Sequence, residues 1–212
     1  MTKAKICGLS TPDAVAAAVE GKADFIGFMF FPASPRNVTP ETAAWLAAPA
    51  RGKTKIVAVM VDPTHEDLFE MTKVLLPDYI QMHGSEPPYR VNEVARQGGR
   101  PIIKAMPVSS AKDIYAADAF DGMVEHLLFD AKSPKDSLLP GGNAAQFDWD
   151  LLKGRKFQRP YFLAGGLDPW NVGEAIARSG APMVDVSSGV ERGPGLKDPD
   201  LIAAFLDAVR RA

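Results

Sequence analysis

Three glycine-containing turns in the second half of the chain have the composition of an anion-binding site. They are Gly141-Gly142 followed by Asn143, Gly165-Gly166, and Ser188-Gly189 preceded by Ser187. Glycine lets backbone N–H groups approach a ligand closely, and consecutive N–H groups at a helix start attract anions. These turns therefore predict a phosphate site. The alternative is that each glycine pair only makes a tight turn.

Residues with reactive or charged side chains stand where other apolar runs end, or in the loops that follow. They are Cys7, Arg36, Gln81, His83, Asp130 and Asp185. Each has a structural alternative: a lone cysteine often serves as a small hydrophobic residue, Asp130 could end a strand as a turn residue, and most arginines are solvated. Taken singly, none of these residues indicates a function.

Their spacing groups some of them on common strand faces. Because side chains alternate along a strand, Lys5 and Cys7 are expected to share one face. For the same reason Gln81 pairs with His83, and Asp185 with Ser187. The sequence leaves open whether these faces point into one common cavity.

Eight short apolar runs, rich in β-branched residues, alternate with longer helix-like stretches and predict eight strands. The runs span residues 4–7, 24–30, 55–61, 79–83, 101–106, 126–131, 161–165 and 183–188. Several are almost continuously apolar, as is typical of parallel strands buried on both faces.

Several predicted helices begin with a shared signal, an acceptor side chain at the N-cap followed by proline. The signal occurs at Thr11-Pro12, Thr39-Pro40, Asp168-Pro169 and Asp198-Pro199. Ser110 is expected to cap the helix between the fifth and sixth strands.

A strand followed by a helix, repeated eight times, favours an α/β fold of the (β/α)8 barrel type, with residues 1–212 as a single domain. The alternative is a doubly wound open sheet. No GxGxxG motif follows the first strand, which argues against a dinucleotide-binding half. In a barrel, chemistry gathers at the carboxyl ends of the strands, which is where the polar residues above stand.

The composition argues against several classes of function. The net charge is -2, with Lys and Arg spread along the chain, so no basic patch for nucleic acid is expected. No apolar run approaches the ~20 residues of a membrane span, and no signal-peptide pattern is present. A single cysteine forms no internal disulfide, and the three histidines are too scattered for a metal site. We expect a soluble cytoplasmic protein that handles small molecules.

The motifs taken together resemble those of the phosphoribosylanthranilate isomerase family of tryptophan biosynthesis. The resemblance covers almost the whole chain, through KICGL (5–9), DFIGFMFFPASPR (24–36), IQMHG (80–84), LLFDAK (127–132), FDWDLL (147–152), LAGGLDPWNV (163–172) and VDVSSGVE (184–191).

The resemblance implies an Amadori rearrangement, which converts N-(5-phosphoribosyl)anthranilate into an open-chain aminoketose without cofactor or metal. It implies Cys7 as general base and Asp130 as general acid. Arg36 would pair with the anthranilate carboxylate, and Asp185 would reach the amine or the sugar hydroxyls. Gln81 and His83 would line the pocket. The phosphate would bind Gly141, Gly142, Gly165, Gly166, Ser188 and Gly189.

This chemistry requires tuned pKa values. Free cysteine titrates near ~8.5, so Lys5 or the cationic substrate is expected to lower the pKa of Cys7. Burial is expected to raise that of Asp130. The sequence departs from the family pattern at Ala144, where a third glycine is common. Alanine resists positive φ, so the backbone path of residues 143–145 is in question.

Rival functions remain open at this point. Indole-3-glycerol-phosphate synthase, the tryptophan synthase α subunit and the histidine-pathway isomerase are barrels with similar glycine turns, but they place a lysine or carboxylate at the end of the first strand. A non-catalytic phosphosugar-binding barrel is a further alternative. The sequence is compatible with a monomer or a homodimer, and with a second aminoaldose substrate.

Overall fold

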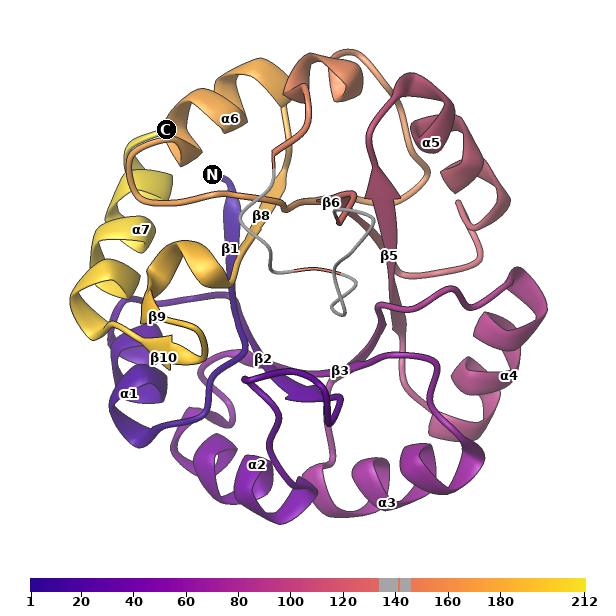
Figure 1. The fold of residues 1–212 in the computed structure, drawn as a ribbon, viewed down its shortest axis with the longest axis vertical. Coiled ribbons are helices and arrows are strands. Elements are labelled where there is room, and N and C mark those ends of the chain that lie inside the picture. The colour runs from indigo at the N-terminus through magenta and orange to yellow at the C-terminus, as the bar shows by residue number, and fades with distance from the viewer. Residues whose placement is uncertain (134–140, 142–145) are drawn as a thin grey trace.

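The computed structural model describes residues 1–133, 141 and 146–212, and it forms a closed barrel of eight parallel strands in the order β1 to β8 (Figure 1). The strands are β1 (Lys3–Cys7), β2 (Phe25–Phe30), β3 (Lys55–Met60), β4 (Tyr79–Met82), β5 (Ile102–Val108), β6 (His126–Ala131), β7 (Phe162–Leu163) and β8 (Met183–Val186). Lys3 to Ile6 of β1 pair in register with β8, which closes the ring. The predicted barrel is confirmed.

Helices surround the barrel. They are α1 (Pro12–Glu20), α2 (Pro40–Ala47), α3 (His65–Leu75), α4 (Pro88–Gly98), α5 (Ala111–Ala116), α6 (Val172–Ser179) and α7 (Pro199–Arg211). The predicted caps at Thr11, Thr39 and Asp198 are confirmed, because each side chain accepts a backbone N–H of the first helical turn. Ser110 caps α5 in partnership with Asp113.

Two helix predictions are wrong. Asp168 accepts the N–H groups of Trp170 and Asn171, and Asn171 Oδ1 accepts the N–H of Asp168, so these residues close a turn and α6 begins only at Val172. Between β6 and β7, the described residues form a 3-10 helix (Trp149–Leu152) in place of the eighth α-helix. Gly154 follows it at a φ of +74°, which ends any helical continuation.

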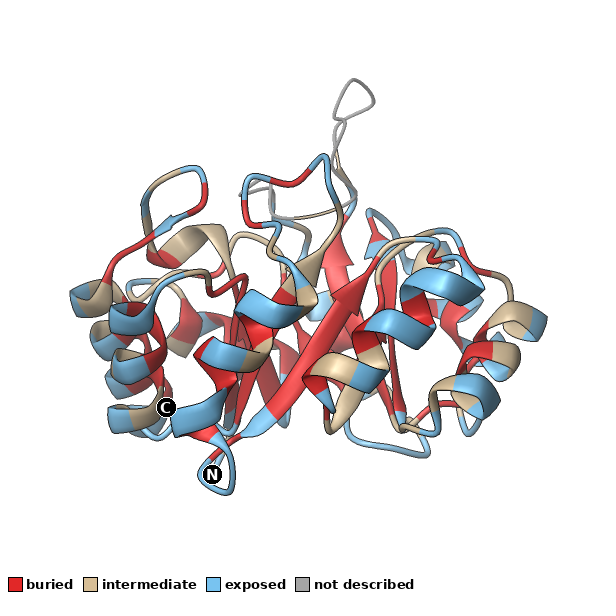
Figure 2. Cartoon of the chain, turned by 90° about the horizontal axis from the view of Figure 1, so that it is seen from below, coloured by how far each residue is buried: buried red, intermediate tan, exposed pale blue. Residues whose placement is uncertain are grey.

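The barrel has two apolar cores, and the strands separate them. The inner core contains Cys7, Phe25, Leu128, Phe162 and Met183, whereas the outer core lies between strands and helices. Figure 2 shows the buried strands in red and the exposed sides of the surrounding helices in pale blue. Because side chains alternate, the inner faces of the strands carry the polar residues at their carboxyl ends into the barrel mouth.

After β8 the chain forms a small antiparallel hairpin, β9 (Glu191–Gly193) and β10 (Leu196–Lys197), that lies beside β1 and β2 at the rim (Figure 1). None of the helices in the described part of the chain is long and apolar enough to cross a membrane.

Candidate active site

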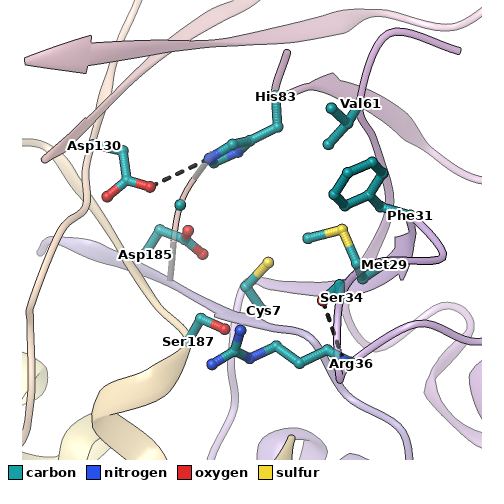
Figure 3. Close-up of a pocket in the computed structure, with 11 residues that line it drawn as sticks. Cys7, Met29, Phe31, Ser34, Arg36, Val61, His83, Asp130, Asp185 and Ser187 are labelled. Atoms are coloured by element: carbon teal, nitrogen blue, oxygen red, sulfur yellow. Dashed lines mark hydrogen bonds and ion pairs between the residues drawn. The ribbon is translucent and has the colours of Figure 1, made fainter. Parts of the chain in front are cut away.

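One cavity lies in the barrel mouth at the carboxyl ends of the strands (Figure 3). The cavity is small and partly open to solvent. The lining residues are Cys7, Met29, Phe31, Ser34, Arg36, Val61, His83, Asp130, Gly141, Asp185 and Ser187. The inner faces therefore do share one cavity.

Cys7, the last residue of β1, lies next to a buried ion pair. Lys5, two residues earlier on the same inner face, is fully buried and donates to Asp185 Oδ1 of β8 at 2.9 Å. Burial by itself lowers the pKa of Lys5, but the charges of Asp185 and Cys7 outweigh it and the pKa is raised. Lys5 is therefore a fixed positive charge beside the thiol.

The expected lowering of the Cys7 pKa is not found. Burial raises the pKa of the Cys7 thiol, and Lys5, which acts in the opposite direction, does not compensate. Asp185 adds a further raising effect because its carboxylate disfavours a nearby thiolate. In the ligand-free protein the balance thus favours the neutral thiol.

Gly27 of β2 provides the space for this group. It pairs with Cys7 in register, and a side chain there would place a Cβ 3.1 Å from Cys7 Sγ and 3.3 Å from Lys5 Nζ. The absence of a side chain at Gly27 is therefore part of how the thiol and the lysine fit together.

Asp130 lies at the end of β6, and His83 follows β4. His83 Nε2 is 3.2 Å from Asp130 Oδ2 (Figure 3). Gln81 Nε2 is 2.8 Å from His83 Nδ1. Because an amide nitrogen only donates, Nδ1 accepts from Gln81, and Nε2 carries the proton that faces Asp130. Gln81 thus orients His83, and His83 orients Asp130.

The position expected for Gln81 needs a correction. Its side chain is fully buried behind His83 and is not among the groups that line the cavity. The reason is that its inner-face position lies one layer deeper in the barrel than that of His83.

Arg36, in the loop after β2, is buried and lines the cavity near Ser187 (Figure 3). Its Nε and Nη2 donate to the two carboxylate oxygens of Glu191 at 2.7 and 2.9 Å. Lys197 Nζ also donates to Glu191. No role was predicted for Glu191 or Lys197 from the sequence; the glycine-containing turn between them, at Gly193 and Gly195, was the available signal.

The glycine turns after β7 and β8 adjoin one another. A Cβ at Gly189 would lie 1.9 Å from the Leu167 carbonyl oxygen, and one at Gly165 would lie 2.5 Å from the backbone nitrogen of Ala131. Gly165 and Gly166 both have positive φ, at +86° and +61°. None of the hydrogen bonds within the described residues uses the N–H of Gly165, Gly166, Ser188 or Gly189.

The third glycine segment adjoins the Asp130 carboxyl, as Gly165 does. A Cβ at Gly141 would be 2.5 Å from His83 Nε2 and 2.6 Å from Asp130 Oδ2, so Gly141 packs against that pair. Gly142, and the loop around Ala144, lie outside the described residues.

The apolar part of the cavity wall was not predicted as such. Met29 and Phe31 of β2 and its loop, together with Val61 after β3, face the thiol across the mouth (Figure 3). Alternation from Gly27 would have indicated that Met29 is on the inner face. These side chains provide a surface suited to a flat aromatic ring next to the arginine.

Comparisons with known proteins agree with this geometry. A family model described as N-(5'-phosphoribosyl)anthranilate (PRA) isomerase matches residues 4–208. A protein of Caulobacter sp. (strain K31) named N-(5'-phosphoribosyl)anthranilate isomerase is 61% identical over 212 residues, which cover 100% of both chains.

Two solved structures extend the comparison to the fold. The phosphoribosyl anthranilate isomerase of Thermotoga maritima is 33% identical, with a TM-score of 0.89 over 100% of both chains. A phosphoribosyl anthranilate isomerase in complex with reduced 1-(o-carboxyphenylamino)-1-deoxyribulose 5-phosphate is 31% identical, with a TM-score of 0.85 over 100% of both chains. The chain belongs to the N-(5'-phosphoribosyl)anthranilate isomerase family.

Proposed function

We propose that this chain catalyses the Amadori rearrangement of N-(5-phosphoribosyl)anthranilate to 1-(2-carboxyphenylamino)-1-deoxyribulose 5-phosphate in tryptophan biosynthesis. The observation that carries the proposal is a thiol and a carboxyl, Cys7 and Asp130, on the walls of one small cavity in a protein of this family. Both residues are buried, so water competes little with the substrate for their protons.

Asp130 serves as general acid. Its proton passes to the furanose ring oxygen as the bond between that oxygen and C1 breaks, and the nitrogen lone pair forms a protonated imine at C1. His83 Nε2 lies 3.2 Å from Oδ2 of Asp130, so the imidazole ring holds the carboxyl in place.

Cys7 serves as general base. As the thiolate it removes the C2 hydrogen, which the adjacent iminium has acidified, and the electron pair moves to give an enolamine. The enolamine then takes a proton at C1 and loses the proton of its C2 hydroxyl, which gives the ketone. Because burial raises the pKa of Cys7, the iminium charge of the intermediate complements Lys5 in stabilising the thiolate.

The two ends of the substrate have separate binding groups. Arg36 binds the anthranilate carboxylate, with the ring against Met29, Phe31 and Val61. The phosphate binds the N–H groups of the adjoining turns at Gly165-Gly166 and Ser188-Gly189, with the Gly141-Gly142 segment as a further contact. Asp185 contacts the substrate amine or the sugar hydroxyls. A cytoplasmic location, a single domain and a monomeric or homodimeric state are part of the same proposal.

The experiment follows the loss of fluorescence when the anthranilate-derived substrate is rearranged. We expect turnover by the wild type, and losses of about 100-fold or more in kcat for Cys7→Ala and for Asp130→Asn. Cys7→Ser is a matched variant that keeps the shape and raises the pKa of the base. Near-normal turnover by the folded Cys7→Ala and Asp130→Asn variants would contradict the assignment.

The same assay distinguishes the rival functions. Binding without turnover by the wild type would indicate a non-catalytic phosphosugar-binding barrel. Turnover of the aminoaldose of histidine synthesis would show a second substrate in the same cavity. Absence of both binding and turnover would contradict the proposed function itself.

A further inference from the structure

The hairpin β9–β10 brings a carboxylate and a lysine against Arg36, and all three side chains are almost completely withdrawn from solvent. Exposed fractions of the side chains are 6% for Arg36, 4% for Glu191 and 0% for Lys197. Burying three charged groups is costly unless they satisfy one another or serve a ligand. The burial of these three charged side chains therefore needs a physical explanation.

Each side chain of this group is held in place by hydrogen bonds to its neighbours. Lys197 Nζ donates to the backbone oxygen of Ser187 at 3.0 Å and to Glu191, and the N–H of Gly195 donates to Glu191 Oε2 at 3.2 Å. Glu191 in turn accepts two bonds from Arg36. The arginine is thus held through Glu191 by the hairpin, and the hairpin is held by the end of β8.

Packing around the aliphatic part of the Arg36 side chain restricts its conformation. A Cβ at Gly8, which has a φ of +77°, would lie 2.6 Å from Arg36 Cδ, and one at Gly195 would lie 2.6 Å from the Pro35 oxygen. Gly8 therefore packs against the aliphatic part of the Arg36 side chain, and the tip of the hairpin packs against the loop that contains Arg36. The guanidinium has one orientation that keeps all of these contacts.

That orientation leaves part of the guanidinium for a ligand. Glu191 occupies the edge formed by Nε and Nη2, and within the part of the chain that the structure describes no hydrogen bond reaches Nη1. The edge formed by Nη1 and Nη2 is a second bidentate site of the same type. Two cations on one carboxylate leave one net positive charge, which matches one carboxylate on the ligand.

The charges of the group are coupled as this arrangement requires. Burial by itself raises the pKa of Glu191, but the hydrogen bond from Arg36 and the charge of Lys197 outweigh it, so the pKa is lowered. Burial lowers the pKa of Lys197, and the charge of Glu191 offsets this effect only in part. Glu191 is thus ionised at neutral pH, and its carboxylate is able to hold the guanidinium of Arg36.

We propose that Glu191 and Lys197 are positioning residues, which hold Arg36 so that its remaining edge binds the carboxylate of the substrate. The inference rests on the proposed function, in which Arg36 contacts that carboxylate. It goes further in assigning the hairpin a role in substrate selection: without Glu191 the enzyme loses its preference for a substrate that carries a carboxylate.

The test compares two substrates, N-(5-phosphoribosyl)anthranilate and N-(5-phosphoribosyl)aniline, which lacks the carboxylate. In Glu191→Gln the side-chain amide cannot accept both hydrogen bonds from the guanidinium of Arg36. We therefore expect KM for the anthranilate substrate to rise about tenfold or more, with kcat changed less than about threefold. The kcat/KM for the aniline substrate stays near the wild-type value.

Two controls accompany this variant. Arg192→Gln changes a residue of the same hairpin whose side chain is 65% exposed and pairs with Asp198, and it leaves both substrates unaffected. In an Arg36→Met background, Glu191→Gln has no further effect on the ratio of the two kcat/KM values, because Glu191 acts through Arg36.

An equal loss for both substrates in Glu191→Gln, or no loss for either, would overturn the proposal. If Glu191→Gln does not fold, Gly195→Ala carries the test, since it moves the hairpin tip away from Pro35 without changing any charge; it must reduce the same ratio. Failure of the proposed function is recognised separately, because Arg36→Met then leaves the ratio at the wild-type value.

Discussion

Among the buried lysine–carboxylate pairs, the two whose lysine lies on a barrel strand differ in what surrounds that lysine. Lys5 and Asp185 are 2.9 Å apart on the inner side of the barrel, and Lys104 and Glu86 are 2.8 Å apart. Lys104 follows Ile103, which belongs to the inner core, so it points outward toward the helix layer.

Lys104 is saturated by backbone groups. Its Nζ donates to the carbonyl oxygens of Gly84 and Ala105 at 2.8 and 3.0 Å, in addition to Glu86. Glu86 accepts the N–H groups of Asp62 and Gly84, so this pair ties together the loops after β3 and β4. Lys5 has Asp185 and the neighbouring thiol instead. Burial and charge are alike in the two pairs. They differ in their partners, and in the proposed mechanism only the inner pair lies beside a catalytic group.

Removing the inner lysine is expected to have the largest effect on activity. Lys5→Met leaves Cys7 without the charge that opposes its burial, and we expect kcat/KM to fall about 100-fold. In the proposed mechanism activity requires the thiolate, so kcat/KM of the wild type is expected to rise as pH rises through the Cys7 pKa. In Lys5→Met that pKa is higher still, and the rising limb moves to higher pH. A pH–rate profile of both proteins measures this; an unshifted limb would show that Lys5 does not tune the thiol.

Removing the outer lysine is expected to reduce stability rather than the chemical step. Lys104→Met leaves Glu86 as an unpaired buried carboxylate, and we expect the free energy of unfolding to fall by about 3 kcal/mol. Urea unfolding at constant pH measures the change, with kcat determined on the folded fraction. A drop in kcat that matches that of Lys5→Met would remove the distinction between the two pairs.

A methyl group at Gly27 tests the inner pair without changing any charge. The added Cβ would lie 3.1 Å from Cys7 Sγ, closer than most real contacts, so the thiol or Lys5 must shift. We expect Gly27→Ala to lower kcat about tenfold, because small displacements of a catalytic group are costly. Gly173→Ala in α6, where nothing lies within 4 Å of the new Cβ, is the matched control and leaves kcat unchanged.

Acid stability is expected to depend on a carboxylate outside both pairs, with the smallest effect. The hydrogen bond from Arg192 and the backbone N–H groups of α7 lower the pKa of Asp198 from 3.8 to about 2. A lowered folded-state pKa contributes stability that is present above the unfolded value and is lost as pH falls toward about 2. Asp198→Asn keeps an acceptor at the cap, so its unfolding midpoint should vary less with pH between about 4 and 2.

The strands and most helix starts could be predicted because their signals are local. Apolar runs of strand length and a cap residue followed by proline depend on neighbouring residues only. The prediction failed at Asp168 because Asn171, three residues further on, binds back to it and closes a turn. It failed again after β6, where the described residues form only one short 3-10 helix.

Periodicity, caps and motif order are properties of the linear chain, so they favoured the barrel over an open sheet and indicated the family and the residues at the strand ends. The pairing of Lys5 with Asp185, 180 positions away, and of Arg36 with Glu191, 155 positions away, is seen only in the folded protein. The same is true of the raised pKa of Cys7. Charge pairing and burial depend on distances in space, and closing the ring of strands is what brings those residues together.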